Sequence, residues 1–240
     1  MILTAHQPVY LPWLGLFHKI ALADEFISFD RVQYVPKDWI SRNQVKTSQG
    51  SVMLTVPALR KGYLNKTIAE IEINNNAPWM HKHWMTILLN YKKAPYFKRY
   101  ADIFEDVYKR QWNLLADLNF YMLSWFLQIL GIETVIERAV EYNFEGVKSD
   151  LVLNMCLELG AAIYIFGTLG KDYADSEAFL KAGVKPIFQS YNHPVYKQLH
   201  GEFLPYMGIV DLLFNAGPNS LEIIMSGNIN KNDILDKSVT

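Results

Sequence analysis

Residues 1–30 read MILTAHQPVYLPWLGLFHKIALADEFISFD, and this stretch decides the fold. Met1 to Ala5 forms a β-type run. Pro12 suits the first turn of a helix because its missing N–H would have no partner there, and apolar residues then recur at helical spacing up to about Ala23. A second β-type run covers Glu25 to Phe29. Strand, helix and strand within about 30 residues predict a parallel β-α-β unit.

The rest of the chain resumes this alternation after a helical interruption. The predicted elements are a hairpin of strands 42–47 and 51–56, helices at about 79–91, 96–107 and 112–130, a strand at 133–139, a helix from residue 149 or 150 to 160, a strand at 162–166, a helix near 176–182, a strand at 185–189, and a last helix from 211 that breaks at 217. Five strands separated by helices predict an α/β fold. We expect a Rossmann-like, doubly wound, mostly parallel five-stranded sheet in the order 3-2-1-4-5, with a β-hairpin and a helical insertion.

The length of 240 residues fits one large domain. We expect a single α/β domain over residues 1–228, with the hairpin at 40–57 and the helical insertion at about 78–131. The polar C-terminal tail, residues 229–240, is expected to be frayed or disordered.

Composition excludes several classes of protein. Half of the residues are hydrophobic, which argues against intrinsic disorder, and 23 Lys and Arg balance 24 Asp and Glu, so no global field favours nucleic acid as a partner. The single cysteine, Cys156, excludes an intramolecular disulfide and suits a reducing compartment. No leader peptide and no stretch of about 20 apolar residues is visible, so we expect no membrane span and a cytoplasmic location.

Polar and glycine-bearing residues follow four of the predicted strands. In doubly wound sheets, ligands bind outside the carboxyl ends of the strands, where the strand order reverses. These ends are followed by His6-Gln7, by Asp30-Arg31, by residues 167–173 and by residues 190–198. The sequence therefore predicts one ligand site built from all four places.

His6 precedes the N-terminus of the first helix, where free N–H groups favour an anion. An imidazole beside a bound phosphate suits acid–base work at neutral pH. The alternative is a histidine that pins its loop by hydrogen bonding. Both interpretations remain open on sequence alone.

Two further groups of residues are candidates for anion binding. Gly167 and Gly170 allow backbone N–H groups to approach a phosphate, although a strand-to-helix loop that needs positive φ would also use glycine. Arg42, Lys46 and Arg60 on or near the hairpin are candidates to hold a diphosphate or carboxylate, or they form a solvated face.

Two apparent sites receive a structural interpretation. His81 and His83 lie two residues apart on a predicted helix and so point to nearly opposite sides, whereas metal ligands on one face come at i and i+4. Cys156 shares a helix face with Val152 and Met155, which predicts a buried structural thiol. We assign no metal.

Motifs at both ends of the chain resemble those of the WbqC-like family of bacterial proteins. The N-terminal matches are HQPVYLPWLG at 6–15, Lys19, Asp24, Asp30, Gln33, Arg42 and Asn43; the C-terminal matches are Asp150, Cys156, Gly160, Gly167, Gly170, Tyr173, HPVYKQ at 193–198, Phe203 and DLLFNAG at 211–217. Phe166 departs from the small residue, such as serine, expected before the glycine. A second, fainter likeness to the nucleotidylyltransferase branch of Rossmann-like folds lacks that branch's paired histidines.

The WbqC-like resemblance implies a role in O-antigen or other surface-polysaccharide (lipopolysaccharide) biosynthesis. We expect a cytoplasmic transferase that modifies an activated, nucleotide-linked sugar, expected to be an aminosugar, with His6 as general base. The predicted substrate-binding residues are Gln7, Tyr10, Trp13, Lys19, Asp30, Arg42, Asn43, Gly167, Gly170, Tyr173, Gln189, His193, Tyr196 and Gln198.

The expected partner is a small-molecule nucleotide sugar or phosphorylated sugar. No cofactor is assigned, and a homo-oligomer is compatible with the sequence. Two alternatives stay open: a nucleotidyltransferase-like activating enzyme, and a non-catalytic nucleotide-sugar-binding or scaffold subunit.

Overall fold

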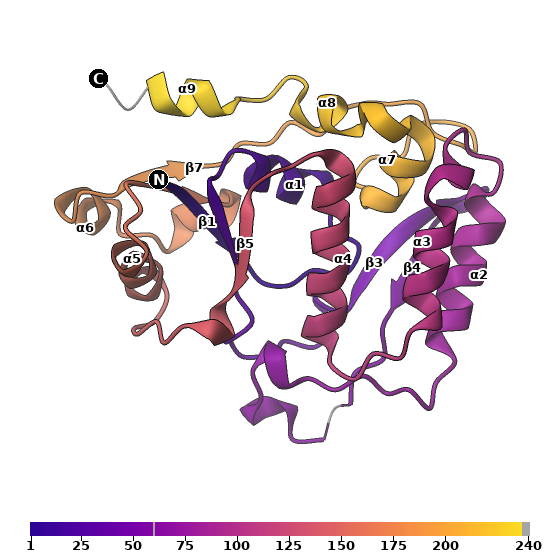
Figure 1. Cartoon of the computed structure of the whole chain (residues 1–240), viewed down its shortest axis with the longest axis horizontal. Helices are drawn as coiled ribbons and strands as arrows, with labels where there is room; N and C mark the ends of the chain where they lie inside the picture. The colour runs from indigo at the N-terminus through magenta and orange to yellow at the C-terminus, as the bar shows by residue number, and fades with distance from the viewer. Residues whose placement is uncertain (60, 237–240) are drawn as a thin grey trace.

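A five-stranded parallel sheet forms the centre of the computed structural model, which describes residues 1–59 and 61–236. Its strands are β1 (Ile2–His6), β2 (Glu25–Ser28), β5 (Val135–Arg138), β6 (Ile163–Phe166) and β7 (Lys185–Phe188). They lie in the order β5-β2-β1-β6-β7 (Figure 1). When these five strands alone are numbered in chain order, their order in the sheet is 3-2-1-4-5, so the predicted topology is confirmed.

Helices cover both faces of this sheet because successive strand residues point to opposite sides. On one face, Leu3 and Tyr164 pack with buried residues of α5 (Ser149–Glu158) and α6 (Ser176–Lys181). On the other face, Ile2 and Ile165 pack with the chain around the end of α1 (Leu14–Ala21). The sheet is therefore doubly wound, as predicted.

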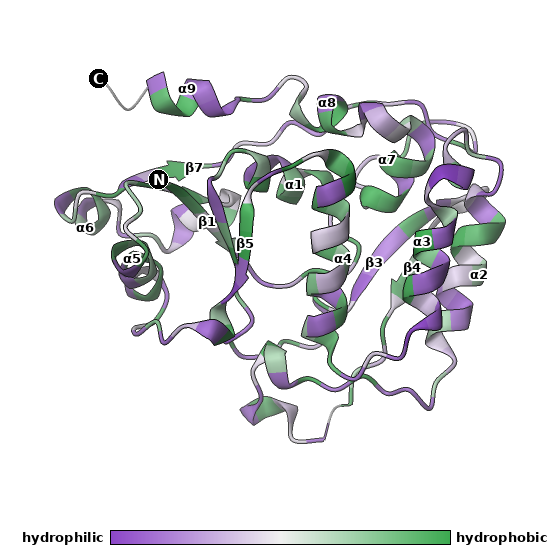
Figure 2. Cartoon of the chain, viewed as in Figure 1, coloured by the Kyte–Doolittle hydropathy of each residue, from purple (hydrophilic) through white to green (hydrophobic). Residues whose placement is uncertain are grey.

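The hairpin and the helical insertion lie side by side. The hairpin pairs β3 (Arg42–Thr47) with β4 (Gly50–Thr55), and Figure 1 shows it between α4 (Leu115–Leu130) and the pair α2 (Trp79–Tyr91) and α3 (Phe97–Lys109). Figure 2 shows the polar character of β3, which contrasts with the apolar strands β1 and β7 of the central sheet. The helices predicted from periodicity are all present, with ends that differ by at most three residues.

The C-terminal region differs from the prediction. The helix expected to begin at 211 is α7 (Ile209–Ala216), and it is followed by α8 (Ser220–Met225) and α9 (Lys231–Asp236), so it is not the last. The expectation of a frayed tail is wrong for α9. Ile234 is buried in one cluster with Ile2 of β1 and Ile163 and Ile165 of β6, and Lys231 pairs with Asp24 at 2.5 Å. Residues 237–240 lie outside the described residues.

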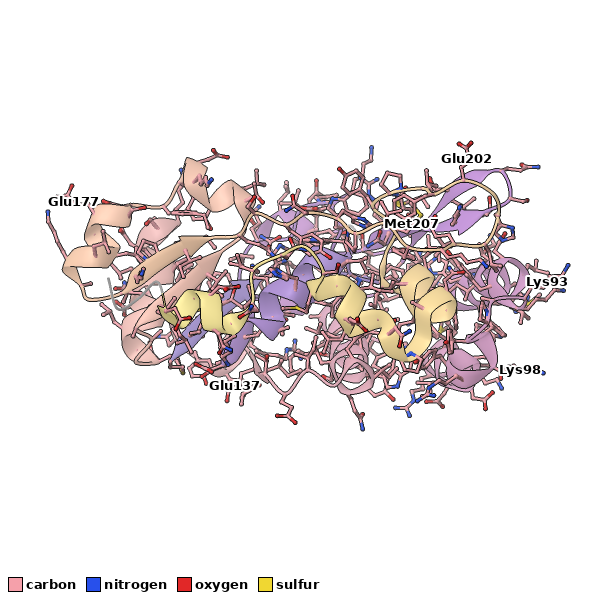
Figure 3. All side chains as sticks on the ribbon, turned by 90° about the horizontal axis from the view of Figure 1, so that it is seen from above. Lys93, Lys98, Glu137, Glu177, Glu202 and Met207 are labelled. Carbon is pink, nitrogen blue, oxygen red and sulfur yellow. The ribbon has the colours of Figure 1, made fainter. Side chains whose placement is uncertain are left out.

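A long irregular segment, residues 189–208, crosses the molecule between β7 and α7. Figure 3 shows it from above, with the Glu202 side chain pointing outward. Lys46 on β3 holds the segment by two hydrogen bonds: its Nζ donates to Gln198 Oε1 at 3.0 Å and to the carbonyl of Glu202 at 2.5 Å. This segment forms part of the site described next.

Within the described residues, no helix has the length and apolar character that crossing a membrane requires.

Candidate functional site

A cleft of about 1180 Å³ opens at the carboxyl ends of β1, β6 and β7. The sheet splits there: the pairing of β1 with β6 ends at Thr4↔Ile165, whereas β1 continues beside β2 to His6↔Ser28 and β6 continues beside β7 to Phe166↔Phe188. This split is the point where the strand order reverses, which is where the topology places a ligand.

Ten of the fifteen predicted site residues line this cleft. They are His6, Gln7, Trp13, Lys19, Asn43, Gly167, Gly170, Tyr173, Gln189 and His193. The early imidazole and the late glycine turn therefore border one cavity, although they are separated by about 160 residues of sequence. Their role in binding remains a prediction.

Lys19 lies at the base of the split. Its side chain is 3% exposed, and its Nζ donates to the carbonyl of Ala5 at 2.9 Å. Among the described residues it has no carboxylate partner. Burial lowers the pKa of Lys19 to about 7 because the charged form is poorly solvated. A lysine that lines a cleft, lacks a counter-ion and is about half protonated at pH 7 suits an anionic ligand, because a bound anion favours its charged form.

His6 is held in one tautomer. Its Nδ1 lies 2.8 Å from the carbonyl of Gln7, and since a carbonyl only accepts, Nδ1 carries the proton and Nε2 keeps a lone pair. The ring also meets Trp13 edge-on at 5.2 Å. Burial, with a smaller effect from the Lys19 charge, lowers the pKa of His6 to about 4. The imidazole is therefore neutral at pH 7 and able to accept a proton.

Gly167 and Gly170 belong to the turn that follows β6, and the interpretation that they need positive φ is wrong. Gly167 has φ −71°, and a Cβ built on it would meet nothing within 4 Å. Gly170 is needed for packing, since a Cβ there would lie 2.5 Å from Cβ of Phe166. Neither the backbone conformation nor the neighbours of Gly167 require glycine, so its open face is available to a ligand.

Asn43 holds the loop between β1 and α1. Its Nδ2 donates to the carbonyl of Tyr10 at 3.2 Å and to that of Leu11 at 2.6 Å. Leu11 has φ 48°, a left-handed conformation that disfavours a leucine. Asn43 therefore stabilises the turn that presents His6 and Trp13 to the cleft.

Gln189 and His193 line the cleft from the irregular segment. Gln189 Nε2 bonds to the carbonyl of Gly15 at 2.8 Å and lies 2.9 Å from Nδ1 of His18, which ties the segment to α1. His193 Nδ1 lies 2.9 Å from the carbonyl of Pro194, and its Nε2 is buried with no partner among the described residues.

The model of the WbqC-like protein family matches residues 7–223, which include both sides of the cleft. The chain belongs to the WbqC-like protein family. A similar protein is the uncharacterized protein Rv1507c of Mycobacterium tuberculosis, 36% identical over 213 residues, which are 88% of this chain and 92% of the relative. No solved structure matches the chain. The resemblance is thus confirmed at the level of the family.

Tyr10 and Tyr196, two of the predicted substrate-binding residues, do not line the cleft of this WbqC-like chain. Tyr10 is fully buried, and its hydroxyl lies 2.8 Å from His83 Nδ1 and 2.5 Å from the hydroxyl of Tyr108. Tyr196 is 8% exposed and donates to the buried Asp211 at 2.8 Å. Both rings turn into the core because their hydroxyls find partners there.

Asp30, Arg42 and Gln198 also lie outside the cleft lining. The Asp30 carboxylate forms an ion pair with Arg138, with Oδ2 2.6 Å from Nε, and this pair connects the end of β2 to β5. Gln198 bonds to Lys46 and to the backbone of Leu204, so it shapes the irregular segment. Arg42 begins β3, and its Nε is buried without a partner among the described residues.

Cys156 and the pair His81 and His83 have structural rather than ligand-binding surroundings. Cys156 is fully buried, as predicted, and burial raises the pKa of its thiol to about 12. His83 is buried beside Tyr10 while His81 is exposed, so the two imidazoles do not face a common point. Of the other candidates for anion binding, Arg60 lies outside the described residues, and Lys46 donates its hydrogen bonds to the irregular segment.

No group of three or more metal-binding side chains occurs within residues 1–59 and 61–236.

The cleft lining includes residues that sequence reasoning did not name, among them Trp39, Lys148 and Tyr206, and Tyr191, which lies within the predicted stretch 190–198 but was not singled out. Lys148 has φ 52° and ψ −120° at the start of α5, a conformation that normally needs glycine. Tyr191 packs over Gly15, where an added Cβ would lie 2.9 Å from its ring. These residues sit in irregular segments, where no periodic pattern marks a buried or facing side chain. Gly15 in the N-terminal motif was the one available signal, because a glycine there indicates that another side chain packs closely against α1.

Proposed function

We propose that this protein is a cytoplasmic group-transfer enzyme that modifies an activated, nucleotide-linked sugar, expected to be an aminosugar, in surface-polysaccharide synthesis. The observation that supports it best is Lys19, a buried ammonium in the cleft with no carboxylate beside it among the described residues. Family membership supplies the biosynthetic context and not the reaction.

A buried ammonium is unfavourable unless an anion or several hydrogen bonds stabilise it. Lys19 has three donors, and one of them reaches the carbonyl of Ala5. The open face of Gly167 lies across the same cleft, where a backbone can approach a ligand closely. Together they favour a phosphate group at the split of the sheet.

The size of the cleft suits a transfer between two molecules. Its volume of about 1180 Å³ exceeds the roughly 300–1,000 Å³ of common small-molecule sites. His6, neutral and with a free Nε2 lone pair, is the group that would take the proton from an attacking amine or hydroxyl. Its role does not require a metal.

The first test is binding of inorganic pyrophosphate to the wild-type chain and to Lys19→Met. We expect the substitution to weaken binding about 10- to 100-fold, because a hydrogen-bonded charge contributes roughly 1.5–3 kcal/mol. Lys93→Met changes an exposed lysine that does not line the cleft and serves as the matched control (Figure 3). Equal binding by all three proteins would reject the phosphate site.

The second test is turnover with a panel of nucleotide sugars and acceptors. His6→Ala should lower turnover by about 10² to 10⁴ if the imidazole transfers a proton in the slow step. Release of pyrophosphate from a nucleoside triphosphate would instead assign a nucleotidyltransferase-like activity.

A binding protein is the second candidate, because the pKa of His6 lies at about 4 and makes the imidazole a weak base. Under this alternative, ligands stabilise the protein against heat and no product forms with any donor in the panel.

A further inference from the structure

His193 carries a hydrogen-bond acceptor that the protein leaves unused. Its Nδ1 lies 2.9 Å from the carbonyl of Pro194, so Nδ1 is the protonated nitrogen and Nε2 holds a lone pair. That Nε2 is buried and has no partner among the described residues, although His193 lines the cleft. Buried polar atoms are nearly always paired, so an unpaired one in a cleft indicates a ligand group that pairs with it.

The lone pair defines the chemistry of that ligand group. An unprotonated imidazole nitrogen accepts a hydrogen bond, so the partner must be an N–H or O–H donor. Burial lowers the pKa of His193, which keeps the ring neutral near pH 7.

Aromatic side chains surround this end of the cleft. The His193 ring meets Tyr206 at 5.3 Å and Tyr191 at 6.4 Å, and Trp39 lines the same cleft. Tyr206 is 69% exposed and Trp39 is 42% exposed, so both have free surface for a ligand. A flat nucleobase stacks on such rings, and this stacking needs few polar partners.

A line of rings joins this end to the phosphate end. His6 contacts Trp13 at 5.2 Å, and Trp13 and Tyr191 both lie beside Gly15, within 3.3 Å of where its Cβ would be. Tyr191 in turn contacts His193. An elongated ligand that follows this wall would have its phosphates near Lys19 and its far end at His193.

We infer that the His193 end of the cleft holds the nucleobase of the nucleotide-linked substrate, with an N–H of the base donating to His193 Nε2. The inference rests on the proposed function, because it takes the phosphate position near Lys19 from it. Since Nε2 is covered in the free protein, the side chains around His193 must shift for the base to reach it.

Calorimetric titration with pyrophosphate, glucose 1-phosphate and the diphosphates of uridine, cytidine, adenosine and guanosine tests this placement. His193→Leu removes the acceptor, His193→Gln offers an amide oxygen in its place, and His81→Leu, an exposed histidine on α2, is the control. We expect the tightest nucleoside diphosphate to bind His193→Leu about 5- to 10-fold more weakly, with partial recovery in His193→Gln. Pyrophosphate should bind all variants equally.

Nitrogen-15 NMR of the wild-type histidine rings gives a readout that does not depend on a variant folding. The Nε2 resonance of His193 should be that of an unprotonated nitrogen and should shift when the nucleoside diphosphate, but not pyrophosphate, is added. A protonated Nε2 in the free protein would overturn the inference.

The outcomes separate the two proposals. Should His193→Leu weaken glucose 1-phosphate alone, or every ligand equally, or none, the placement of the base is wrong while the phosphate site stands. Should pyrophosphate fail to bind the wild-type chain, or bind Lys19→Met unchanged, the proposed function itself falls.

Discussion

At the scale of single residues, the buried Lys19 is expected to favour binding of an anion and to lower the stability of the fold. The ammonium is buried where β1 and β6 separate, and it bonds to the carbonyl of Ala5, which points into that gap. In the folded protein its pKa is about 7, against 10.5 for an ordinary lysine. The charged form is therefore disfavoured by folding, and a protein selected for stability alone would carry an apolar residue here.

Lys19→Met is accordingly expected to stabilise the protein at pH 7 by about 1–3 kcal/mol, after allowance for the lost bond to Ala5. The sign follows from linkage: the folded pKa is lowered, so the cost is complete below about pH 7 and disappears as pH rises toward 10.5. Chemical denaturation of both proteins between pH 6 and 10 checks this. A variant less stable than wild type at pH 7 would contradict it.

His6 gives the second prediction at this scale. Its pKa of about 4 results from burial and then from Lys19, so NMR titration should show a neutral ring down to about pH 4. Because the unfolded chain binds its proton near pH 6.5, this residue lowers stability as pH falls from 6.5 to 4. In Lys19→Met the His6 pKa should rise, since one neighbouring charge is gone. A His6 pKa near 6.5 in the wild-type chain would show that the imidazole is solvated.

At the scale of elements, the loops of the site were harder to predict than the strands that carry them. The β-type runs and the spacing of apolar residues identified all five strands, and the rule for strand reversal placed the cleft. Tyr10 and Tyr196 were misplaced because an aromatic residue in a loop has no periodicity that shows which way it points. Their hydroxyl partners, His83 and Asp211, lie 73 and 15 residues away, and only the tertiary structure reveals them.

The turn after β6 yields a matched pair of substitutions. Gly167→Ala should leave stability unchanged or raise it by up to about 1 kcal/mol, because φ is −71° and the space is empty, yet it should weaken pyrophosphate binding. Gly170→Ala should destabilise by about 1–3 kcal/mol, because its Cβ would meet Phe166 at 2.5 Å. Thermal unfolding and titration of both variants decide the matter. Equal losses of stability would refute the distinction.

At the scale of the whole molecule, the helical insertion shares its core with the sheet. One continuous cluster joins Leu14 and Phe17 of α1 to Ile87, Phe104 and Phe126 of the insertion. The hydroxyl of Tyr10 adds polar bonds across the same boundary, to His83 on α2 and Tyr108 on α3. The loop that carries His6 is therefore attached to both parts, and the site depends on their common packing.

This shared core predicts that the chain unfolds in one step. All six tryptophans lie between residues 13 and 125, so their fluorescence reports on α1, the hairpin and the insertion, whereas far-UV circular dichroism reports on the whole chain, including β6, β7 and α5. If residues 1–228 form a single domain, the two signals should follow the same urea transition, with one midpoint and one slope. Separate midpoints would mean that the insertion is a domain of its own, and the loop at His6 would then lose its support before the sheet does.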